Sequence, residues 1–282
     1  MPELPEVETI VRKLRPHLKG RNFTEIELLW EGVVDRPDPA TFCEQMMGAR
    51  VAALGRRGKF LIFTLESGAH LLVHLRMTGK FRVHSPGEEP EDDVHTRALF
   101  RMDDGAWLAY IDTRKFGRFY LVDDPAEVVG ALGPEPLAES FTAETFAERL
   151  VGRRGEIKRL LLNQHFIAGL GNIYVSEALW QAGIHPERTA DTLTEEEIRR
   201  LHRAITEALR AGIRNGGTSL QDRQYVYPDG ALGRHQERLV VYDREGERCP
   251  RCGYAVVRIV QGQRSTYFCR VCQPSPVSES AS

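Results

Sequence analysis

The sequence predicts an α+β fold made of several domains. Three observations support this prediction: an amphipathic helix at the N-terminus, a long region of short apolar runs typical of antiparallel strands, and a helical region followed by two closely spaced cysteine pairs. The chain has 282 residues, and domains of about 150 residues would give about two of them.

The first helix is expected over residues 5–18, because Pro5 suits a first helical position and Val7 and Ile10 begin an apolar stripe. Residues 23–122 then show short runs of Val, Ile, Leu and Phe, broken by Gly and charged pairs. This pattern indicates antiparallel β-structure, either a sandwich or a barrel.

The composition changes near residues 133–136, where Gly-Pro-Glu-Pro predicts a linker. Residues 142–215 are predicted to be helical, and Thr194 with Glu197 opens one helix as a capping box. Residues 216–238 are rich in Gly, Asp and Arg and predict a long loop, of the kind that is functional or disordered. We therefore expect a β-domain over 1–133, a helical domain over 134–238 that includes this loop, a cysteine module over 239–273 and a disordered tail over 274–282.

The charge balance excludes a strongly basic chain. Lys and Arg number 38 and Asp and Glu number 40, which gives a net charge of −2 with neutral histidines. A nucleic-acid partner would therefore have to meet a local basic surface. The sequence holds no apolar run of about 18 residues, so we expect no membrane span. It does not open with a basic and then an apolar segment, so we expect no secretory signal.

The cysteine pattern predicts a zinc site. Cys249 and Cys252 form one C-x2-C pair, and Cys269 and Cys272 form another, which is the spacing of a four-thiolate zinc ribbon. The residues between the pairs predict a β-hairpin that turns near Gly262. Two disulfides or free thiols are the alternatives, and the missing secretory signal disfavours disulfides. Four thiolates leave no open position on the metal, so one structural Zn²⁺ is expected.

Pro2 is a candidate nucleophile. Methionine before proline is usually trimmed, and the α-amine then exposed has a pKa of about 7.7–8, well below that of lysine. The positive end of the following helix disfavours the ammonium form further. Such an amine can attack an aldehyde-level carbon to form an iminium, with Glu3 beside it to move protons. The alternative is that Pro2 only starts the helix and Glu3 only complements its dipole.

Three motifs resemble the formamidopyrimidine-DNA glycosylase family, also called 8-oxoguanine DNA glycosylases. They are MPELPEVE at 1–8, NQHFIAGLGNIYVSEALW at 163–180 and GQRSTYFCRVCQ at 262–273, and they occur in the family's order. The resemblance implies an N-terminal helix on a β-sandwich, a helix–two-turn–helix module and a zinc finger. It also implies that DNA lies across the cleft between two lobes.

The resemblance further implies a bifunctional DNA glycosylase and AP lyase of base excision repair. Such an enzyme flips an oxidised purine, 8-oxoguanine or a formamidopyrimidine, out of the duplex, because the target atom cannot be reached inside the stack. Pro2 would displace the base, and the Schiff base would cut the strand by β- and δ-elimination. The implied partner is damaged double-stranded DNA. The resemblance also implies a monomer that needs no small-molecule cofactor and is located in the bacterial cytoplasm, at the nucleoid.

Residue roles follow from the same resemblance. Pro2 matches the nucleophile, Glu3 the proton-transfer carboxylate, Lys59 a lysine at the lesion phosphate, and Arg264 the zinc-finger arginine that grips phosphate and assists the last elimination. Three residues match the group that fills the hole left by the flipped base: Met77, Arg114 and Phe116. The other implied DNA contacts are His74, His95, Arg153, Lys158 and Asn172. Glu177 is expected to be a buried carboxylate without a chemical role.

The loop 216–238 resembles the family's lesion-capping loop but departs from it in two places. Gln221 stands where a basic residue is expected, and Arg234-His235 stands where an aromatic pair is expected. Both departures concern the reading of the damaged base rather than the reaction. The acidic segment 85–93 is expected to point away from DNA.

Two other functions compete. Endonuclease VIII-like glycosylases, which prefer oxidised pyrimidines, share Pro2, Glu3, the helical module and the finger, whereas Leu4 and the Met77, Arg114 and Phe116 set favour the purine class. A non-catalytic, zinc-dependent DNA-binding protein would be expected to lack Pro2, Glu3 or Lys59, and all three are present.

Overall fold

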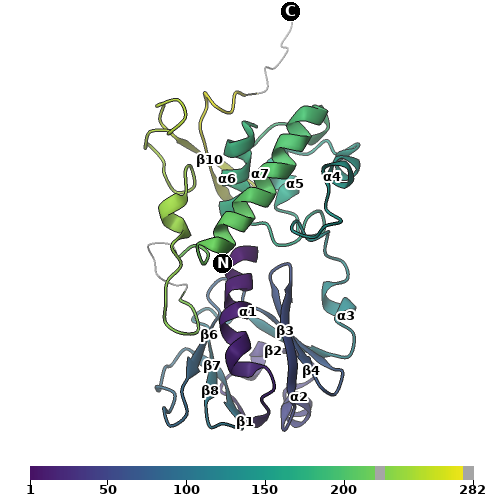
Figure 1. Ribbon diagram of the computed structural model, residues 1–282, viewed down its shortest axis with the longest axis vertical. Coiled ribbons are helices and arrows are strands. Elements are labelled where there is room, and N and C mark those ends of the chain that lie inside the picture. Colours follow the sequence, from purple (N-terminus) through teal and green to yellow (C-terminus); the bar gives the residue numbers. More distant parts are fainter. Residues whose placement is uncertain (220–225, 276–282) are drawn as a thin grey trace, which may run out of the picture. The chain divides into compact units, whose positions relative to one another are not determined.

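The computed structural model describes residues 1–219 and 226–275 and divides the chain into two compact units (Figure 1). Unit 1 comprises Met1–Ala131 and Ile213–Gln236, and unit 2 comprises Leu132–Gly212 and Glu237–Ser282. The first division lies at the predicted linker. The loop expected over 216–238 does not group with the helical unit, because almost all of it belongs to unit 1.

Unit 1 begins with helix α1 (Leu4–Leu18), close to the predicted 5–18. Its buried positions recur on one face, and α1 lies along strand β3 (Val51–Arg57) in Figure 1. Two polar contacts fix this packing. Arg56 Nε donates to Glu8 Oε2 over 3.0 Å, and Arg15 donates to the carbonyl of Leu54 over 3.0 Å. The N-terminus of α1 is thereby held beside one end of β3.

Two sheets follow, as the apolar runs predict. The four-stranded sheet has the order β1-β7-β8-β6 and is antiparallel throughout. The five-stranded sheet has the order β2-β9-β5-β4-β3, and in it only β2 and β9 are parallel. The other bounds in unit 1 are β1 (Phe23–Leu28), η1 (Glu31–Val33), β2 (Val34–Arg36), α2 (Pro39–Met46), β4 (Phe60–Leu65), β5 (His70–His74), β6 (Lys80–His84), β7 (Thr96–Met102), β8 (Trp107–Ile111), β9 (Arg118–Val122) and α3 (Ala126–Val129).

The two sheets pack face to face as a sandwich. Phe81 of the four-stranded sheet stacks on Phe119 of the five-stranded sheet, with ring centroids 6.5 Å apart. Tyr110 meets the same Phe119 ring edge-on at 4.8 Å. Aromatic side chains thus fill the space between the sheets, where each excludes a large apolar area from water. Of the two architectures that the sequence left open, the structure has the sandwich.

The segment 213–236 belongs to this unit because it contacts residues that are distant from it in the sequence. Tyr227 is buried in the sandwich core. The Val83 N–H donates to the carbonyl of Pro228 over 3.0 Å, and Lys13 forms an ion pair with Asp229. A loop that contributes an aromatic ring to a core must group with that core, whatever its neighbours in the chain.

Unit 2 contains the predicted helical region and the predicted finger. Its elements are α4 (Ala143–Leu150), α5 (Ile157–Leu161), α6 (Asn172–Ala182), η2 (Ala190–Thr192), α7 (Glu195–Arg214, of which the last two residues fall in unit 1), η3 (His235–Arg238, of which the first two residues fall in unit 1), β10 (Val257–Gln261) and β11 (Arg264–Phe268). The capping box predicted at α7 is present, since Thr194 N–H donates to Glu197 over 2.8 Å and Glu197 N–H donates to Thr194 over 3.2 Å. Among the described residues, no helix is both long and apolar enough to cross a membrane.

Candidate functional site

The N-terminal residues are fixed by one carboxylate. Pro2 is buried and Glu3 is only 3% exposed. The Glu3 N–H donates to Glu6 Oε2 over 2.9 Å, and the other oxygen of Glu6 accepts the Thr218 N–H over 2.7 Å. Gly217 packs against the same side chain, where an added Cβ would lie 2.9 Å from Glu6 Oε1. Glu6 therefore ties the candidate nucleophile to the loop that begins at residue 216.

Sequence reasoning assigned no role in the site to Glu6. A sequence signal for its bond to Glu3 was present, because Glu6 stands three positions after the helix N-cap Glu3, which is the spacing of a capping box. Its bond to Thr218 could not be foreseen, since that partner lies far along the chain.

Lys59 and His74 lie close together at one end of the five-stranded sheet. Lys59 is buried in the tight turn between β3 and β4, where Gly58 has a φ of +56°. Phe60 pairs with His74 across β4 and β5, and the two rings meet edge-on at 4.6 Å. Burial, and after it the positive charges of Arg76 and Lys59, lower the pKa of His74 to about 3. His74 is therefore a neutral ring beside a buried lysine.

The hydrogen bonding of His74 assigns its tautomer. The Arg76 N–H donates to His74 Nδ1 over 3.0 Å, so the ring proton belongs on Nε2. A neutral imidazole with Nε2–H can donate to a phosphate oxygen, the commonest type of protein–DNA hydrogen bond. This geometry suits the DNA contact expected of His74.

The three residues expected to fill the hole in the DNA come from two neighbouring turns. Met77 and Phe116 are apolar yet 43% and 46% exposed. The Arg114 guanidinium lies over the Phe116 ring at 4.6 Å. The turns are joined by a hydrogen bond from Thr78 Oγ1 to Asp112 Oδ1. The structure thus places these predicted residues on linked turns of one unit.

His95 stands near the same group of turns and is exposed. Its carbonyl accepts the Asp112 N–H over 2.9 Å, and its Nδ1 lies 3.4 Å from an Arg97 nitrogen. Sequence reasoning missed both Asp112 and Arg97, because their partners are backbone groups and, for Asp112, a side chain distant in the sequence.

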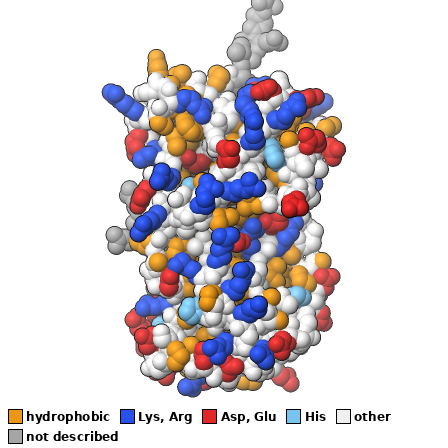
Figure 2. All heavy atoms as spheres, viewed as in Figure 1, with side chains coloured by type: hydrophobic (Ala, Val, Ile, Leu, Met, Phe, Trp, Pro, Cys, Tyr) orange, Lys and Arg blue, Asp and Glu red, His pale blue; other side chains and the backbone are white. Residues whose placement is uncertain are grey.

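Figure 2 shows a local basic surface of unit 1, with Lys and Arg side chains gathered where Figure 1 places α1. Arg12 and Arg15 are exposed members of this helix, although Arg12 also forms an ion pair with Glu8 at 2.7 Å. A chain of net charge −2 can therefore still present positive charge locally.

In unit 2, Arg264 stands at the tip of the finger hairpin. Gly262 and Gln263 form the two-residue turn with φ values of +55° and +64°, which is the left-handed pair that a type I′ hairpin turn requires. Arg264 follows directly and is exposed. The turn thus projects this arginine into solvent, as a phosphate contact requires.

The next residue anchors the hairpin to the helices. The Ser265 carbonyl accepts Lys158 Nζ over 3.1 Å and Asn172 Nδ2 over 2.8 Å. Lys158 also donates to Thr266 Oγ1 over 2.6 Å and is only 1% exposed. Both side chains, which the resemblance implies as DNA contacts, hold the strand that presents Arg264, and their contact with DNA stays a prediction. Asn172 Oδ1 has no hydrogen-bond partner among the described residues, and Arg153 is exposed in the loop between α4 and α5.

The four predicted metal ligands form one cluster. The sulfurs of Cys249, Cys252, Cys269 and Cys272 all lie within 4.8 Å of one another. Two of these separations are 3.4 and 3.8 Å, far beyond a disulfide bond of about 2.05 Å, and all four cysteines are free. Tetrahedral zinc with Zn–S bonds of about 2.3 Å places sulfurs about 3.8 Å apart. The donor set therefore fits one Zn²⁺ and not the disulfide alternative.

Glu177 is the buried carboxylate that the sequence predicts. It accepts the backbone N–H groups of Val240, Val241 and Tyr242, each over 2.9 Å. Burial raises the pKa of Glu177, and these three donors oppose that rise. The side chain thus fixes the segment that leads from unit 1 into the finger.

The structure describes one of the two departures in the loop 216–238, Arg234-His235, which belongs to unit 1. His235 is buried, and its N–H donates to the Gly217 carbonyl over 3.0 Å. Gln236 accepts the Ser219 N–H over 3.1 Å and donates to the Gly233 carbonyl over 2.7 Å. Gln221 lies outside the described residues. The histidine that replaces an expected aromatic residue therefore packs inside the loop.

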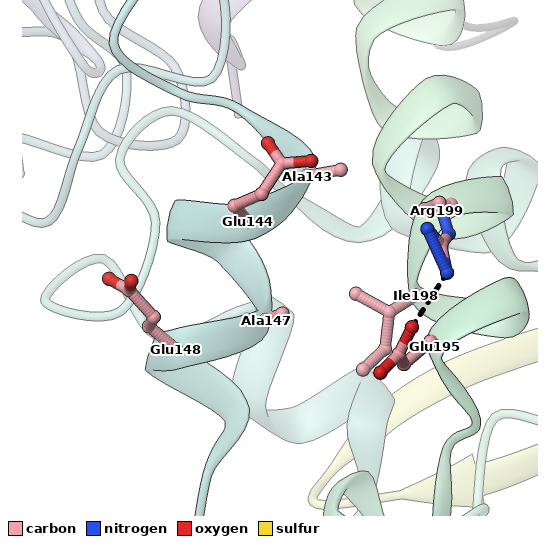
Figure 3. A pocket seen from close by; sticks show the side chains of 7 residues that line it. All are labelled: Ala143, Glu144, Ala147, Glu148, Glu195, Ile198 and Arg199. Carbon is pink, nitrogen blue, oxygen red and sulfur yellow. Dashed lines mark hydrogen bonds and ion pairs between the residues drawn. The ribbon is translucent and has the colours of Figure 1, made fainter.

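A cavity of about 280 Å³ lies between α4 and the start of α7. Figure 3 shows Ala147 and Ile198 facing it, with an ion pair of 2.7 Å between Glu195 and Arg199 at its side. None of its lining residues is a predicted site residue. The candidate chemistry therefore lies elsewhere, at the N-terminus and the turns described above.

Comparison with known families places this arrangement. Residues 1–119 match the formamidopyrimidine-DNA glycosylase N-terminal domain, 132–224 match the H2TH domain of the same enzymes, and 246–274 match a zinc finger found in FPG and IleRS. The chain belongs to the formamidopyrimidine-DNA glycosylase family. The family resemblance, the fold class and the zinc finger predicted from the sequence are thereby confirmed.

Individual relatives span nearly the whole chain. The formamidopyrimidine-DNA glycosylase of Chloroflexus aurantiacus is 47% identical, over 97% of this chain and 98% of that protein. The crystal structure of the MutM (Fpg) protein from Thermus thermophilus is similar with a TM-score of 0.88 and 42% identity, covering 98% of this chain and 100% of that one. The Lactococcus lactis Fpg in complex with abasic-site DNA gives a TM-score of 0.89 and 37% identity, over 97% and 100%.

Loss of one zinc ligand is expected to weaken DNA binding through Arg264. Cys269→Ser leaves three thiolates and loosens the base of the hairpin, because folding of such modules depends on the metal. We expect zinc content to fall and the Kd for lesion-containing duplex to rise by at least about tenfold. Atomic absorption and fluorescence anisotropy measure the two quantities. Cys43→Ser, outside the cluster, is the matched control. Unchanged affinity after complete loss of metal would contradict the structural role of zinc.

His74 is expected to make the fold acid-sensitive. Its pKa is lowered to about 3 in the folded protein, whereas an unfolded chain's histidine titrates near 6.5. Between these values the unfolded state binds more protons, so the free energy of unfolding falls as the pH falls from about 6.5 towards 3. From pH 6.5 to 5 the loss is roughly 2 kcal/mol. Urea unfolding at pH 7 and pH 5 should show this extra loss in the wild type but not in His74→Gln; equal losses in the two proteins would contradict it.

Proposed function

We propose that this protein is a bifunctional DNA glycosylase and AP lyase of base excision repair that removes oxidised purines from duplex DNA. The observation that carries the proposal is the N-terminus of a chain of this family, where Pro2 and Glu3 are buried and fixed by the Glu6 carboxylate. An α-amine held in this way is already oriented for attack before the substrate binds, so little further entropy is lost in orienting it.

The proposed reaction requires removal of Met1. The freed Pro2 nitrogen forms a bond to C1′ of the damaged nucleotide while the bond from C1′ to the base breaks, and the base leaves with the electron pair and takes up a proton. The amine loses its own proton, for which Glu3 is the adjacent acceptor. The sugar ring then opens: the C1′–O4′ bond breaks, O4′ takes up a proton, and the nitrogen lone pair forms the iminium. The iminium acidifies the neighbouring sugar hydrogens, so the 3′ and then the 5′ phosphate can leave by β- and δ-elimination.

Other residues support this scheme by position. Lys59 lies beside neutral His74, which suits binding of the lesion phosphate by one cation and one neutral donor. Arg264 at the hairpin tip suits a second phosphate. The Lactococcus lactis relative has been crystallised with DNA that contains an abasic site and with DNA that contains N7-benzyl-Fapy-dG. Damaged double-stranded DNA is therefore the proposed partner.

The purine class is favoured over the pyrimidine class by specific features. Met77, Arg114 and Phe116 are presented together, as insertion into the vacated stack requires. The relatives from Protochlamydia amoebophila and Chloroflexus aurantiacus are both formamidopyrimidine-DNA glycosylases. We also propose that the protein acts as a monomer at the bacterial nucleoid, without a small-molecule cofactor.

Borohydride trapping tests the nucleophile. Wild-type protein on a duplex with one 8-oxoguanine should give a covalent adduct whose peptide maps to Pro2. Pro2→Gly should lower the trapped fraction at least about tenfold, because its primary amine lacks the fixed ring geometry, while the Kd for the duplex changes by less than about threefold. Anisotropy and mass spectrometry measure these effects.

A chain with one extra residue before Pro2 is the matched control, because its Pro2 nitrogen is an amide that cannot form an iminium. It should bind and not trap. Adduct formation by that chain, or unchanged trapping by Pro2→Gly, would overturn the assignment of Pro2. Trapping only on an oxidised-pyrimidine duplex would transfer the protein to the endonuclease VIII-like class. Absence of trapping on every damaged duplex and on an abasic site would leave a DNA-binding protein.

A further inference from the structure

Hydrogen bonds of the Thr78 hydroxyl join the two turns that carry the proposed stack-filling residues. The turn 75–79 carries Met77, and the loop 112–117 carries Arg114 and Phe116. Thr78 Oγ1 donates to Asp112 Oδ1. The Arg114 N–H then donates to both of these acceptors, to Thr78 Oγ1 over 3.2 Å and to Asp112 Oδ1 over 3.1 Å. Three groups from two turns therefore meet at one point.

Asp112 also closes its own loop. Its second oxygen accepts the Gly117 N–H over 2.8 Å, so one carboxylate binds N–H groups near both ends of the loop. Asp112 is 0% exposed, and both oxygens have partners, so it neither meets solvent nor is available to a substrate. Its carbonyl accepts Arg97 Nε over 2.8 Å, which extends the network towards His95.

Both turns contain backbone that needs such support. Arg76 has a φ of +52° and Lys115 a φ of +58°, a left-handed conformation that non-glycine residues adopt at an energetic cost. Such residues persist where the surrounding structure over-determines them. Each stands next to a proposed stack-filling residue: Arg76 precedes Met77, and Lys115 lies between Arg114 and Phe116.

Close packing holds the turns from the inside. A Cβ on Gly79 would lie 2.3 Å from the Tyr110 hydroxyl oxygen, and one on Gly117 would lie 1.7 Å from the same atom. The two turns therefore share the Tyr110 ring as a common support. From the outside, Arg118 donates to the Gly117 carbonyl over 2.7 Å and lies over the Trp30 ring at 5.5 Å.

We propose that Thr78 and Asp112 are positioning residues that set the spacing between Met77 and the Arg114–Phe116 pair, so that the stack-filling group is preformed before DNA binds. This inference rests on the proposed function. Neither residue touches the reacting atoms. Loss of the hydrogen bond lets the turns move apart, and a displacement of about 1 Å at a site of this kind can cost on the order of a hundredfold in rate.

The proposal makes two substrate classes respond differently. Extraction of a base from a duplex needs the gap to be filled, whereas a preformed abasic site in single-stranded DNA has no stack to fill and no base to extract. Disturbed positioning should therefore slow the first reaction and spare the second. Arg114 can hydrogen-bond the base left without a partner, so disturbed positioning of Arg114 should also weaken the discrimination between bases opposite the lesion.

Thr78→Val removes the hydroxyl and keeps the side-chain shape. We expect the single-turnover rate of 8-oxoguanine excision from duplex to fall at least about tenfold. The ratio of the fastest to the slowest rate among the four opposite bases should shrink at least about threefold. Borohydride trapping on single-stranded abasic DNA should change by less than about twofold.

Two variants serve as controls. Thr78→Ser restores the hydroxyl and should recover duplex excision to within about twofold of the wild type. Thr64→Val removes a hydroxyl that contacts His70, near the end of β4 that is far from Phe60. This variant should leave all three readouts unchanged. Thermal melting of each variant verifies that it is folded. Asp112→Asn, which keeps the shape of the side chain and removes its charge, should repeat the Thr78→Val pattern if it folds.

The outcomes separate this inference from the proposed function. If wild-type protein traps no damaged DNA, the proposed function fails. If the wild type is active and folded Thr78→Val excises at the wild-type rate with unchanged opposite-base ratios, the positioning role is wrong. An equal fall on duplex and on single-stranded abasic DNA, or no recovery in Thr78→Ser, would also overturn it, because the defect would then be general.

Discussion

Three buried carboxylates of this protein, those of Glu6, Asp112 and Glu177, accept hydrogen bonds from backbone N–H groups that have no partner within a helix or strand. Glu6 accepts the N–H groups of Glu3 and Thr218, Asp112 those of Arg114 and Gly117, and Glu177 those of residues 240–242. Buried amides need partners. Each carboxylate satisfies several amides of an irregular segment at once, so the segment becomes as fixed as the sheet or helix beside it.

The three segments fixed in this way are the ones that the proposed function needs. Glu6 holds the N-terminal residues, Asp112 holds the loop of Arg114 and Phe116, and Glu177 holds the entry to the finger. In the finger hairpin the donor and acceptor roles are reversed, since a backbone carbonyl, that of Ser265, accepts hydrogen bonds from the side chains of Lys158 and Asn172. Residues with exposed side chains, such as Arg264 and Phe116, can then be presented on backbone that does not need to reorganise on binding.

The order of the elements and the finger could be predicted because their signals are local. Thr194 and Glu197 form the capping box that their spacing predicts, and the four cysteines cluster as C-x2-C pairs should. Lys158 could not be predicted in the same way, because lysine is almost never fully buried and a surface position is the reasonable expectation. Its burial depends on Ser265 and Thr266, which are distant in the chain.

Local signals predict that the loop 216–238 belongs to the helical domain, and long-range contacts explain why the structure groups most of it with unit 1 instead. It follows helix α7 directly, and nothing local indicates that Tyr227 fills the sandwich core or that Thr218 binds Glu6. The outcome has a consequence for recognition. The loop that departs most from the family pattern is bonded to the same carboxylate that fixes Pro2, and its His235 and Gln236 bind the backbone of this loop at Gly217 and Ser219. We therefore expect differences in this loop to change the position of Pro2, the proposed nucleophile, through Glu6. Under the proposed function, the range of damaged bases and the reactivity of the N-terminus are therefore physically linked properties of unit 1.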